Sequence, residues 1–361
     1  MRSSKIKIVI VDDSAFMRKS LSIMLESDNS IEIIATARDG LEGYELVKKH
    51  RPDLVTLDIE MPKMDGLTAL KKIMADCPTS VVMVSSLTTE GAESTMKALE
   101  LGAVDFIPKE LSFVNVNIIN IKEDLIRKVK AIVNQKRAQE RSSRLQTIAS
   151  RSSANVRNAG SNIPLNDYKA IALGISTGGP LSLQKVIPQI TSSLNVPIFI
   201  VQHMPPRFTK SLADRLNNMS SITVKEAENG EEIKKGFVYI APGGQHMLIK
   251  RNNIIITDAP VNTLHKPSVD VMMHSAIDEY NKRLLGIIMT GMGKDGLEAM
   301  QRLKEINGTC IAQDERTSVV YGMPKAVVEA GIADAVLPLD DIALKINKVF
   351  GNERRLCGTN I

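Results

Sequence analysis

The 361-residue sequence predicts two α/β domains, each built on a mostly parallel sheet. Short apolar runs alternate with segments of helical spacing in both halves, a pattern typical of parallel sheets covered by helices on both faces. Several runs end at polar residues, and α/β proteins place ligand sites beyond such strand ends. A stretch rich in Ser, Arg, Asn and Ala separates the halves. We therefore expect domains over residues 1–137 and 166–361, joined by a flexible linker over residues 138–165.

The first half contains five apolar runs of strand character. Helical spacing follows the first run from Ser14 onward and recurs from Gly40 to Lys49. Five strands that alternate with helices predict a doubly wound (βα)5 domain. The predicted strands are Ile6–Val11, Ile31–Ala35, Leu54–Leu57, Val81–Val84 and Val104–Ile107.

Acidic, hydroxyl and basic side chains gather at the ends of these strands. They are Asp12, Asp13, Asp58, Ser85 and Lys109. Three carboxylates in one crevice repel one another unless a cation lies among them, and Mg²⁺ prefers oxygen ligands. Such a crevice can also accept a phosphoryl group on one carboxylate, because the ion and Lys109 neutralise its charge. A single aspartate at a loop end is usually only solvated, but this combination favours a phosphoryl-accepting magnesium site.

The second half is organised around Leu173–Pro180, which follows the strand-like Lys169–Ala172 and precedes the helical Leu181–Val186. Ser176 in this turn would have an exposed hydroxyl, and N–H groups at the start of a helix can bind developing negative charge. Glycines allow backbone angles that other residues avoid. A glycine-rich turn that only joins a strand to a helix fits this stretch equally well.

Two other strand ends offer partners for Ser176. His203 follows the apolar run Val196–Val201, and Asp295 lies in the glycine-rich loop after Leu284–Met289. A serine hydroxyl becomes a nucleophile when a histidine takes its proton and an acid orients that histidine. Because all three residues occupy strand ends of one α/β layer, we expect them to converge. Taken singly, the histidine and the acid also have structural interpretations, the acid as a helix cap.

The other conspicuous residues of this half are interpreted as structural. His246 and His265 receive no role in the predicted chemistry, and the many methionines are interpreted as core residues. Asp270 and His274 have the i, i+4 spacing of a helical metal pair. No third ligand is evident, so a metal site there is not favoured.

Composition argues against several classes of protein. The net charge of +5 lies mainly in residues 138–165, which carry +3, so neither domain is a basic nucleic-acid module. Aromatic residues make up only 3%, which argues against base stacking. Three dispersed cysteines indicate a reducing compartment. No apolar stretch is long enough to cross a membrane, so we expect a cytoplasmic protein that neither inserts into membranes nor binds nucleic acid.

The first half resembles the receiver domain of two-component response regulators over roughly residues 5–130. The resemblance rests on Asp12-Asp13, Asp58 with the following Met61-Pro62 and Met64-Asp65-Gly66, Ser85 and Lys109. It implies that Asp58 accepts the phosphoryl group and that Asp12 and Asp13 help to hold Mg²⁺. It also implies that Ser85, Phe106 and Lys109 form the switch that couples phosphorylation to conformation. Receivers usually have a proline after the motif lysine, whereas here Glu110 follows Lys109.

The second half resembles the protein-glutamate methylesterases of bacterial chemotaxis, the CheB family, over about residues 168–350. The motifs that carry the resemblance are Gly174–Pro180, Gln202–Met204, Ala241–Met247, Pro267–Asp270 and Thr290–Gly296. It implies that Ser176 is the nucleophile, His203 the base and Asp295 the orienting acid. The backbone N–H of Met292 then belongs to the oxyanion hole, and Thr177 lies beside the nucleophile.

Together, the two resemblances imply a phosphorylation-activated serine esterase that hydrolyses glutamyl methyl esters on chemoreceptors and deamidates receptor glutamines. The implied partners are the methyl-accepting receptors and the chemotaxis histidine kinase CheA as phosphodonor, with recruitment to receptor clusters at the inner face of the membrane. Mg²⁺ serves receiver phosphorylation, and the esterase reaction needs no cofactor. We expect a monomer in which the unphosphorylated receiver covers the Ser176 cleft.

Other classes of output are less consistent with the sequence. A DNA-binding regulator predicts a short basic domain, unlike residues 166–361. A lipase-type hydrolase orders its triad Ser, acid, His, whereas here the order is Ser176, His203, Asp295. A dinucleotide-binding oxidoreductase needs a different glycine spacing. The remaining alternative is a response regulator whose second domain is a different serine hydrolase or a binding domain without catalytic activity. An activity assay distinguishes these from a methylesterase.

Overall fold

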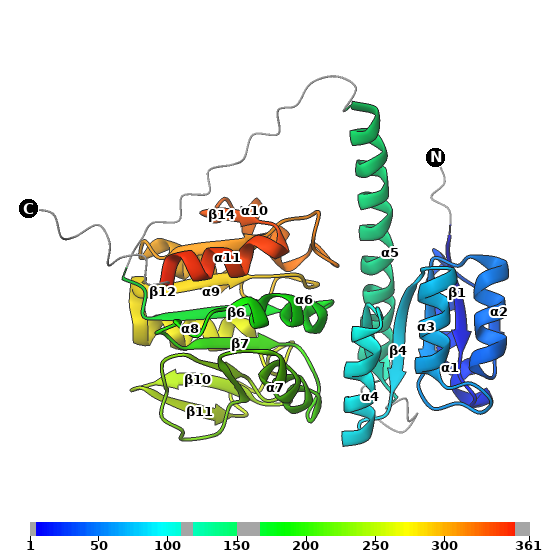
Figure 1. The fold of residues 1–361 in the computed structure, drawn as a ribbon, viewed down its shortest axis with the longest axis horizontal. Helices are drawn as coiled ribbons and strands as arrows, with labels where there is room; N and C mark the ends of the chain where they lie inside the picture. The colour runs from blue at the N-terminus through cyan, green and yellow to red at the C-terminus, as the bar shows by residue number, and fades with distance from the viewer. Residues whose placement is uncertain (1–4, 110–117, 150–166, 351–361) are drawn as a thin grey trace, which may run out of the picture. The chain divides into compact units, whose positions relative to one another are not determined.

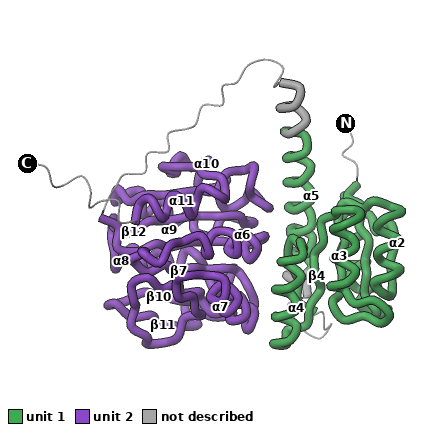
Figure 2. Tube along the Cα trace, in the orientation of Figure 1, with its two compact units in different colours: residues 1–149 green, residues 150–361 purple. Residues whose placement is uncertain are grey.

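The computed structural model describes residues 5–109, 118–149 and 167–350. The chain divides into two compact units, residues 1–149 and 150–361 (Figure 2). Within the described ranges, no helix combines the length and the apolar character that crossing a membrane requires.

The first unit is a five-stranded parallel sheet in the order β2-β1-β3-β4-β5. Figure 1 labels β1 and β4 of this sheet and the helices α1 to α5. Helix α1 packs against α5, while α2, α3 and α4 pack in series, which gives the sheet a helical layer on each face. The strands are β1 (Ile6–Val11), β2 (Ile31–Ala37), β3 (Leu54–Asp58), β4 (Ser80–Ser85) and β5 (Asp105–Pro108). The helices are α1 (Ala15–Glu26), α2 (Gly40–His50), α3 (Gly66–Asp76), α4 (Thr89–Glu100) and α5 (Ile118–Ala149). The predicted doubly wound (βα)5 fold is confirmed.

Helix α5 continues further than the sequence analysis expects. The predicted flexible linker begins at residue 138, but residues 138–149 are helical. These residues contain no Gly or Pro and include Ala, Gln, Arg and Leu, all good helix formers, so low apolar content was a poor sign of flexibility here. Its buried side chains follow helical spacing, at Leu125, Val129, Ile132 and Val133. The rest of the predicted linker, residues 150–165, lies outside the described residues.

The second unit contains a seven-stranded parallel sheet in the order β14-β13-β12-β6-β7-β9-β8 and an antiparallel hairpin, β10-β11. Its strands are β6 (Ala170–Ile175), β7 (Ile198–Gln202), β8 (Thr223–Glu226), β9 (Phe237–Ile240), β10 (His246–Lys250), β11 (Asn253–Thr257), β12 (Leu284–Ile288), β13 (Thr309–Gln313) and β14 (Ala335–Leu337). Its helices are α6 (Gly179–Val186), α7 (Phe208–Met219), α8 (Val269–Tyr280), α9 (Leu297–Glu305), α10 (Met323–Glu329) and α11 (Leu339–Phe350), with short 3-10 turns η1 (Ile187–Gln189) and η2 (Asn281–Arg283). The predicted α/β architecture is confirmed.

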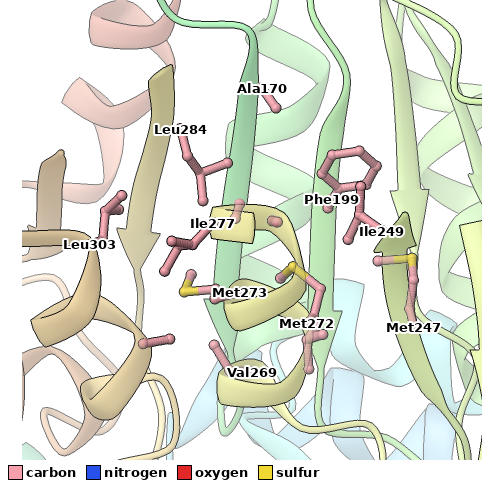
Figure 3. Packing of buried hydrophobic residues seen from close by; sticks show 14 of the residues in the cluster. Ala170, Phe199, Met247, Ile249, Val269, Met272, Met273, Ile277, Leu284 and Leu303 are labelled. Atoms are coloured by element: carbon pink, nitrogen blue, oxygen red, sulfur yellow. The ribbon is translucent and has the colours of Figure 1, made fainter. Parts of the chain in front are cut away.

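Helix α8 lies at the centre of the second unit's core (Figure 3). Met272 and Met273 are buried on this helix, in one cluster with Phe199 from β7 and Met247 from β10. The interpretation of these methionines as core residues is confirmed. Because α8 packs against the sheet, the hairpin and α9, its first residue, Val269, is fixed in place relative to the edge of the sheet where the candidate site lies.

Candidate active site and phosphoryl-acceptor site

Ser176 is the first residue after strand β6, which extends to Ile175 and is therefore longer than predicted. Its backbone N–H donates to the carbonyl of Thr290 at 2.9 Å, so the turn is tied to the neighbouring strand end. Gly178 follows with a φ of +74°, a left-handed conformation that favours glycine and that starts helix α6. The serine side chain is half-buried at the carboxyl edge of the sheet.

His203 is the first residue after β7, the strand that pairs with β6 in parallel. Its backbone N–H donates to the Ile175 carbonyl at 3.3 Å, which places it beside Ser176. The buried Gln202 side chain strengthens this link, because its Nε2 donates to the carbonyls of Ser176 at 3.0 Å and His203 at 3.2 Å. Gln202 belongs to the motif Gln202–Met204, but no role was predicted for its side chain.

Asp295 lies in the loop between β12 and α9 and contacts His203 directly. His203 Nε2 is 2.8 Å from Asp295 Oδ2. The carboxylate also accepts from the backbone N–H groups of Val269 at 2.7 Å and Asp270 at 3.0 Å, and from the Ser268 hydroxyl at 3.0 Å. These donors form the start of α8, whose positive dipole end stabilises an anion. Ser268 lies in the motif Pro267–Asp270, but no role was predicted for it, although a serine before a helix is a recognisable N-cap signal.

The surroundings of Asp295 keep its carboxyl ionised. Burial by itself would raise the pKa of Asp295, but the hydrogen bond and charge of His203 and the N–H groups of Asp270 and Val269 outweigh it and hold the pKa below its ordinary value. An ionised Asp295 requires the hydrogen on His203 Nε2. The other ring nitrogen, His203 Nδ1, is buried and has no hydrogen-bond partner in the described part of the chain. It is therefore free to accept the proton of a neighbouring hydroxyl.

The loop after β12 approaches the nucleophile closely. A Cβ on Gly291 would lie 2.8 Å from the Ser176 Cβ, so glycine is needed for this approach. Thr177 follows Ser176, and Met292 follows Gly291. Among the residues that the structure describes, the backbone N–H groups of Thr177 and Met292 have no hydrogen-bond acceptor. Free N–H groups of this kind suit a developing oxyanion.

The fully buried Thr290 joins the two loops that carry these N–H groups. Its hydroxyl donates to the Thr177 carbonyl at 2.9 Å and accepts from the Val320 N–H at 3.0 Å, while its own N–H donates to Gln313 Oε1 at 2.8 Å. Thr290 opens the motif Thr290–Gly296, but no role was predicted for its side chain. The buried network fixes the spacing between the turn after β6 and the loop after β12.

The first unit brings its predicted acidic residues together at the carboxyl edge of its own sheet, as the second unit does with the candidate triad. Asp12 and Asp58 are buried, Asp13 is exposed, and one oxygen of each lies within 4.8 Å of the others. Lys109 Nζ is 2.7 Å from Asp58 Oδ2 and 4.0 Å from Asp12 Oδ2. Burial, together with the Asp58 charge, raises the pKa of Asp12 to about 6, and burial also raises the pKa of Asp58 against the effect of Lys109. A buried Asp12 oxygen without a hydrogen-bond partner fits a hard cation.

Of the three predicted switch residues, Ser85 and Lys109 line a cavity at Asp58, and Phe106 lies on the neighbouring strand β5. Ser85, at the end of β4, donates its hydroxyl to the Gly91 carbonyl of α4 at 3.1 Å and accepts from Thr95 at 2.8 Å. Phe106 on β5 is buried. A cavity of about 70 Å³ opens next to Asp58, lined by Asp58, Ile59, Glu60, Ser85, Ser86, Gly91 and Lys109. The Ser85 hydroxyl has a single hydrogen, so it can donate to an acceptor in this cavity only by giving up its bond to the Gly91 carbonyl.

These features define a response regulator whose receiver unit accompanies an α/β unit with a Ser-His-Asp arrangement. The chain matches the family model described as response regulator receiver domain over residues 8–118 and the one described as CheB methylesterase over residues 171–346.

Two known proteins are similar to this chain over nearly its whole length, and one solved structure is similar over about half of it. A protein-glutamate methylesterase/protein-glutamine glutaminase of Oleidesulfovibrio alaskensis is 49% identical over 96% of this chain and 100% of its own. One of Pyrococcus abyssi is 44% identical over 94% of this chain and 92% of its own. The crystal structure of the Thermotoga maritima CheB methylesterase catalytic domain has 44% identity, a TM-score of 0.49, and covers 51% of this chain and 100% of its own. The chain belongs to the protein-glutamate methylesterase/protein-glutamine glutaminase family.

Proposed function

We propose that this protein hydrolyses glutamyl methyl esters of chemoreceptors, and deamidates receptor glutamines, under control of phosphorylation at Asp58. The observation that carries the proposal is the 2.8 Å contact between His203 and Asp295, beside Ser176 on the adjacent strand end. Family membership supplies the substrate class, because the curated relatives carry both activities in their names.

In the proposed reaction, Ser176 Oγ attacks the ester carbonyl while His203 Nδ1 takes its proton. Asp295 stabilises the resulting imidazolium through Nε2. The N–H groups of Thr177 and Met292 bind the oxyanion of the tetrahedral intermediate. Methanol then leaves with the proton from His203, giving an acyl-enzyme. Water attacks this ester with His203 as base, which releases the glutamate and restores Ser176; with a glutamine substrate the first leaving group is ammonia.

In the receiver, Asp58 is proposed as the phosphoacceptor, with Asp12 and Asp13 holding Mg²⁺. The ion would neutralise charge on the transferring phosphoryl group, and Lys109 would pair with the product. The proposed donor is the chemotaxis histidine kinase CheA, and the proposed place of action is the cytoplasmic face of receptor clusters. Ser85 and Phe106 would then respond to the added negative charge. If the resting receiver blocks the cleft, removal of residues 1–149 raises the basal rate; an unchanged or lower rate contradicts blocking.

The test is release of labelled methanol from methylated receptor membranes. We expect Ser176→Ala to lower turnover by about 10⁶-fold, while the exposed Ser192→Ala serves as the matched control and stays at the wild-type rate. A small phosphodonor with Mg²⁺ is expected to stimulate the wild type. Methanol release that survives in Ser176→Ala would contradict the assignment of the nucleophile, and no release from the wild type would contradict the proposed activity.

A further inference from the structure

His246 is a fully buried histidine outside the predicted triad. It opens strand β10 at the edge of the second unit's core, and the sequence analysis interpreted it as structural. Both of its ring nitrogens have hydrogen-bond partners, and each partner belongs to a segment that supports the candidate catalytic residues.

The contacts of His246 define its protonation state. The Ser268 backbone N–H donates to His246 Nδ1 at 3.2 Å, so Nδ1 carries no hydrogen. The hydrogen then lies on Nε2, which faces the Pro260 carbonyl at 3.2 Å and the Thr263 hydroxyl at 3.2 Å. The ring is therefore neutral, because a second proton on Nδ1 would confront the Ser268 N–H.

His246 Nδ1 is connected to the proposed catalytic acid, Asp295, through Ser268. Ser268, held by its backbone N–H on His246, donates its hydroxyl to Asp295 Oδ1 at 3.0 Å and caps helix α8. The next two residues of that helix start, Val269 and Asp270, donate their N–H groups to the same carboxylate. Displacement of Ser268 would therefore move a set of donors that fixes the orientation of Asp295.

His246 Nε2 is connected to the proposed catalytic base, His203, through the loop before α8. Pro260 and Thr263 belong to the loop between β11 and α8, and this loop also carries His265. The His265 ring stacks on the His203 ring with a centroid separation of 4.1 Å and an interplanar angle of 19°. His246 thus holds the loop that covers one face of the imidazole of His203.

We propose that neutral His246 is a positioning residue for the hydrolase, holding Asp295 through Ser268 and holding His203 through the loop that carries His265. This inference rests on the proposed function, in which His203 and Asp295 act on Ser176. His246 touches neither the substrate nor the nucleophile.

The surroundings of His246 favour its neutral form. Burial lowers the pKa of His246, and Lys266 acts in the same direction, whereas the Pro260 carbonyl, Asp295 and Asp258 oppose it. Protonation would remove the acceptor of the Ser268 N–H and place two donors against each other. Activity should therefore need the neutral form of His246 in addition to neutral His203.

Two substitutions separate the two nitrogens. In His246→Asn the amide can reach the position of Nδ1 and accept from Ser268, whereas in His246→Gln it can reach the position of Nε2 and keep the loop contact. We expect His246→Gln to lower kcat by about 10²-fold with KM little changed, because small misplacements of catalytic groups have effects of that order. We expect His246→Asn to lower kcat about 10-fold, since it releases only the loop and His265.

A second readout follows the catalytic residues without turnover. The proton between His203 Nε2 and Asp295 is expected to give a downfield ¹H NMR signal, assigned by its loss in Asp295→Ala. We expect this signal to shift in His246→Gln and to keep its position in His246→Asn. The control is His274→Gln on helix α8, a half-buried histidine. In the described part of the chain its side chain forms no hydrogen bond or ring contact with Ser176, His203 or Asp295, so the variant should leave kcat and the signal unchanged.

Clear outcomes would overturn the inference. If folded His246→Gln retains the wild-type kcat and signal, His246 does not position Asp295. If both His246 variants fail to fold, Ser268→Ala, which keeps the N–H to His246 and removes the hydroxyl to Asp295, must lower kcat and shift the signal. If Ser268→Ala keeps the wild-type kcat and NMR signal, His246 does not hold Asp295 through Ser268. Because the NMR signal needs no substrate, a wild type with the signal but without esterase activity would contradict the proposed function alone.

Discussion

Both units place their polar residues at the carboxyl edge of a parallel sheet, yet the two sites differ in charge balance. In the second unit, the carboxylate of Asp295 accepts hydrogen bonds from His203, from two backbone N–H groups and from the Ser268 hydroxyl, and its pKa is lowered. In the first unit, burial raises the pKa values of Asp12 and Asp58, and one lysine faces both. We call the second unit's site the completed site, because protein donors balance the charge of Asp295. We call the first unit's site the incomplete site, because one lysine faces two buried carboxyl groups and the proposed Mg²⁺ would supply the remaining positive charge.

The largest expected effect breaks the completed site. Asp295→Asn keeps the shape of the acid but removes its charge, so the tautomer and the imidazolium of His203 lose support. We expect kcat to fall by about 10⁴-fold, as in other serine hydrolases of this kind. The assay is methanol release at saturating substrate, with the exposed Asp340→Asn as control. A decrease below about 10-fold would show that Asp295 does not orient the base.

Thr290 tests whether the buried network also belongs to the completed site. Thr290→Val keeps the volume but removes the hydroxyl that joins Thr177 and Val320, whereas Thr290→Ser keeps the hydroxyl. We expect about a 10²-fold loss of kcat in the valine variant, since loss of one oxyanion donor has effects of that order or more. The serine variant should recover most of this loss. Equal activities in the two variants would show that the Thr290 hydroxyl does not support oxyanion binding.

Asp58 tests the incomplete site. Asp58→Asn removes the proposed phosphoacceptor, so we expect stimulation by a small phosphodonor to disappear and the basal rate to stay unchanged. Chelation of Mg²⁺ should remove stimulation from the wild type in the same way. The exposed Glu45→Gln should keep the full response. Persistent stimulation in Asp58→Asn would place the phosphoryl group on another residue.

The smallest expected effect concerns stability. Because burial lowers the pKa of His246 below 6.5, the unfolded chain binds a proton that the folded chain does not, so stability falls as the pH decreases through 6.5. We expect His246→Asn to reduce the loss of unfolding free energy between about pH 7.5 and about pH 5.5 by about 1 kcal/mol. Urea unfolding of wild type, His246→Asn and the exposed His50→Asn would measure it. An equal pH dependence in all three would mean that His246 does not titrate on unfolding.

The sequence predicted most strands and every proposed catalytic residue, because these residues lie at strand ends with clear apolar runs before them. It did not predict the supports. Thr290 and Gln202 act through hydrogen bonds to backbone carbonyls far away in the chain, and Ser268 acts through the side-chain carboxylate of Asp295. No local pattern encodes such a partner. The helical extension to Ala149 was missed for a different reason, since a polar composition without Gly or Pro is compatible with both a helix and a linker.

The Asp295 carboxylate caps helix α8 and also orients His203 in the proposed reaction, so one side chain contributes to both folding and catalysis. Asp270 behaves reciprocally, because its side chain accepts from the Ala299 N–H of α9 while its own N–H donates to Asp295. Two helices therefore exchange acidic caps across the loop that holds the catalytic acid. In the course of evolution, loss of Asp295 would weaken the fold at the same time as the reaction, whereas a change to Asn would keep one oxygen to accept from the Asp270 N–H and the Ser268 hydroxyl. An inactive descendant that keeps this architecture is therefore expected to carry Asn more often than Ala at position 295.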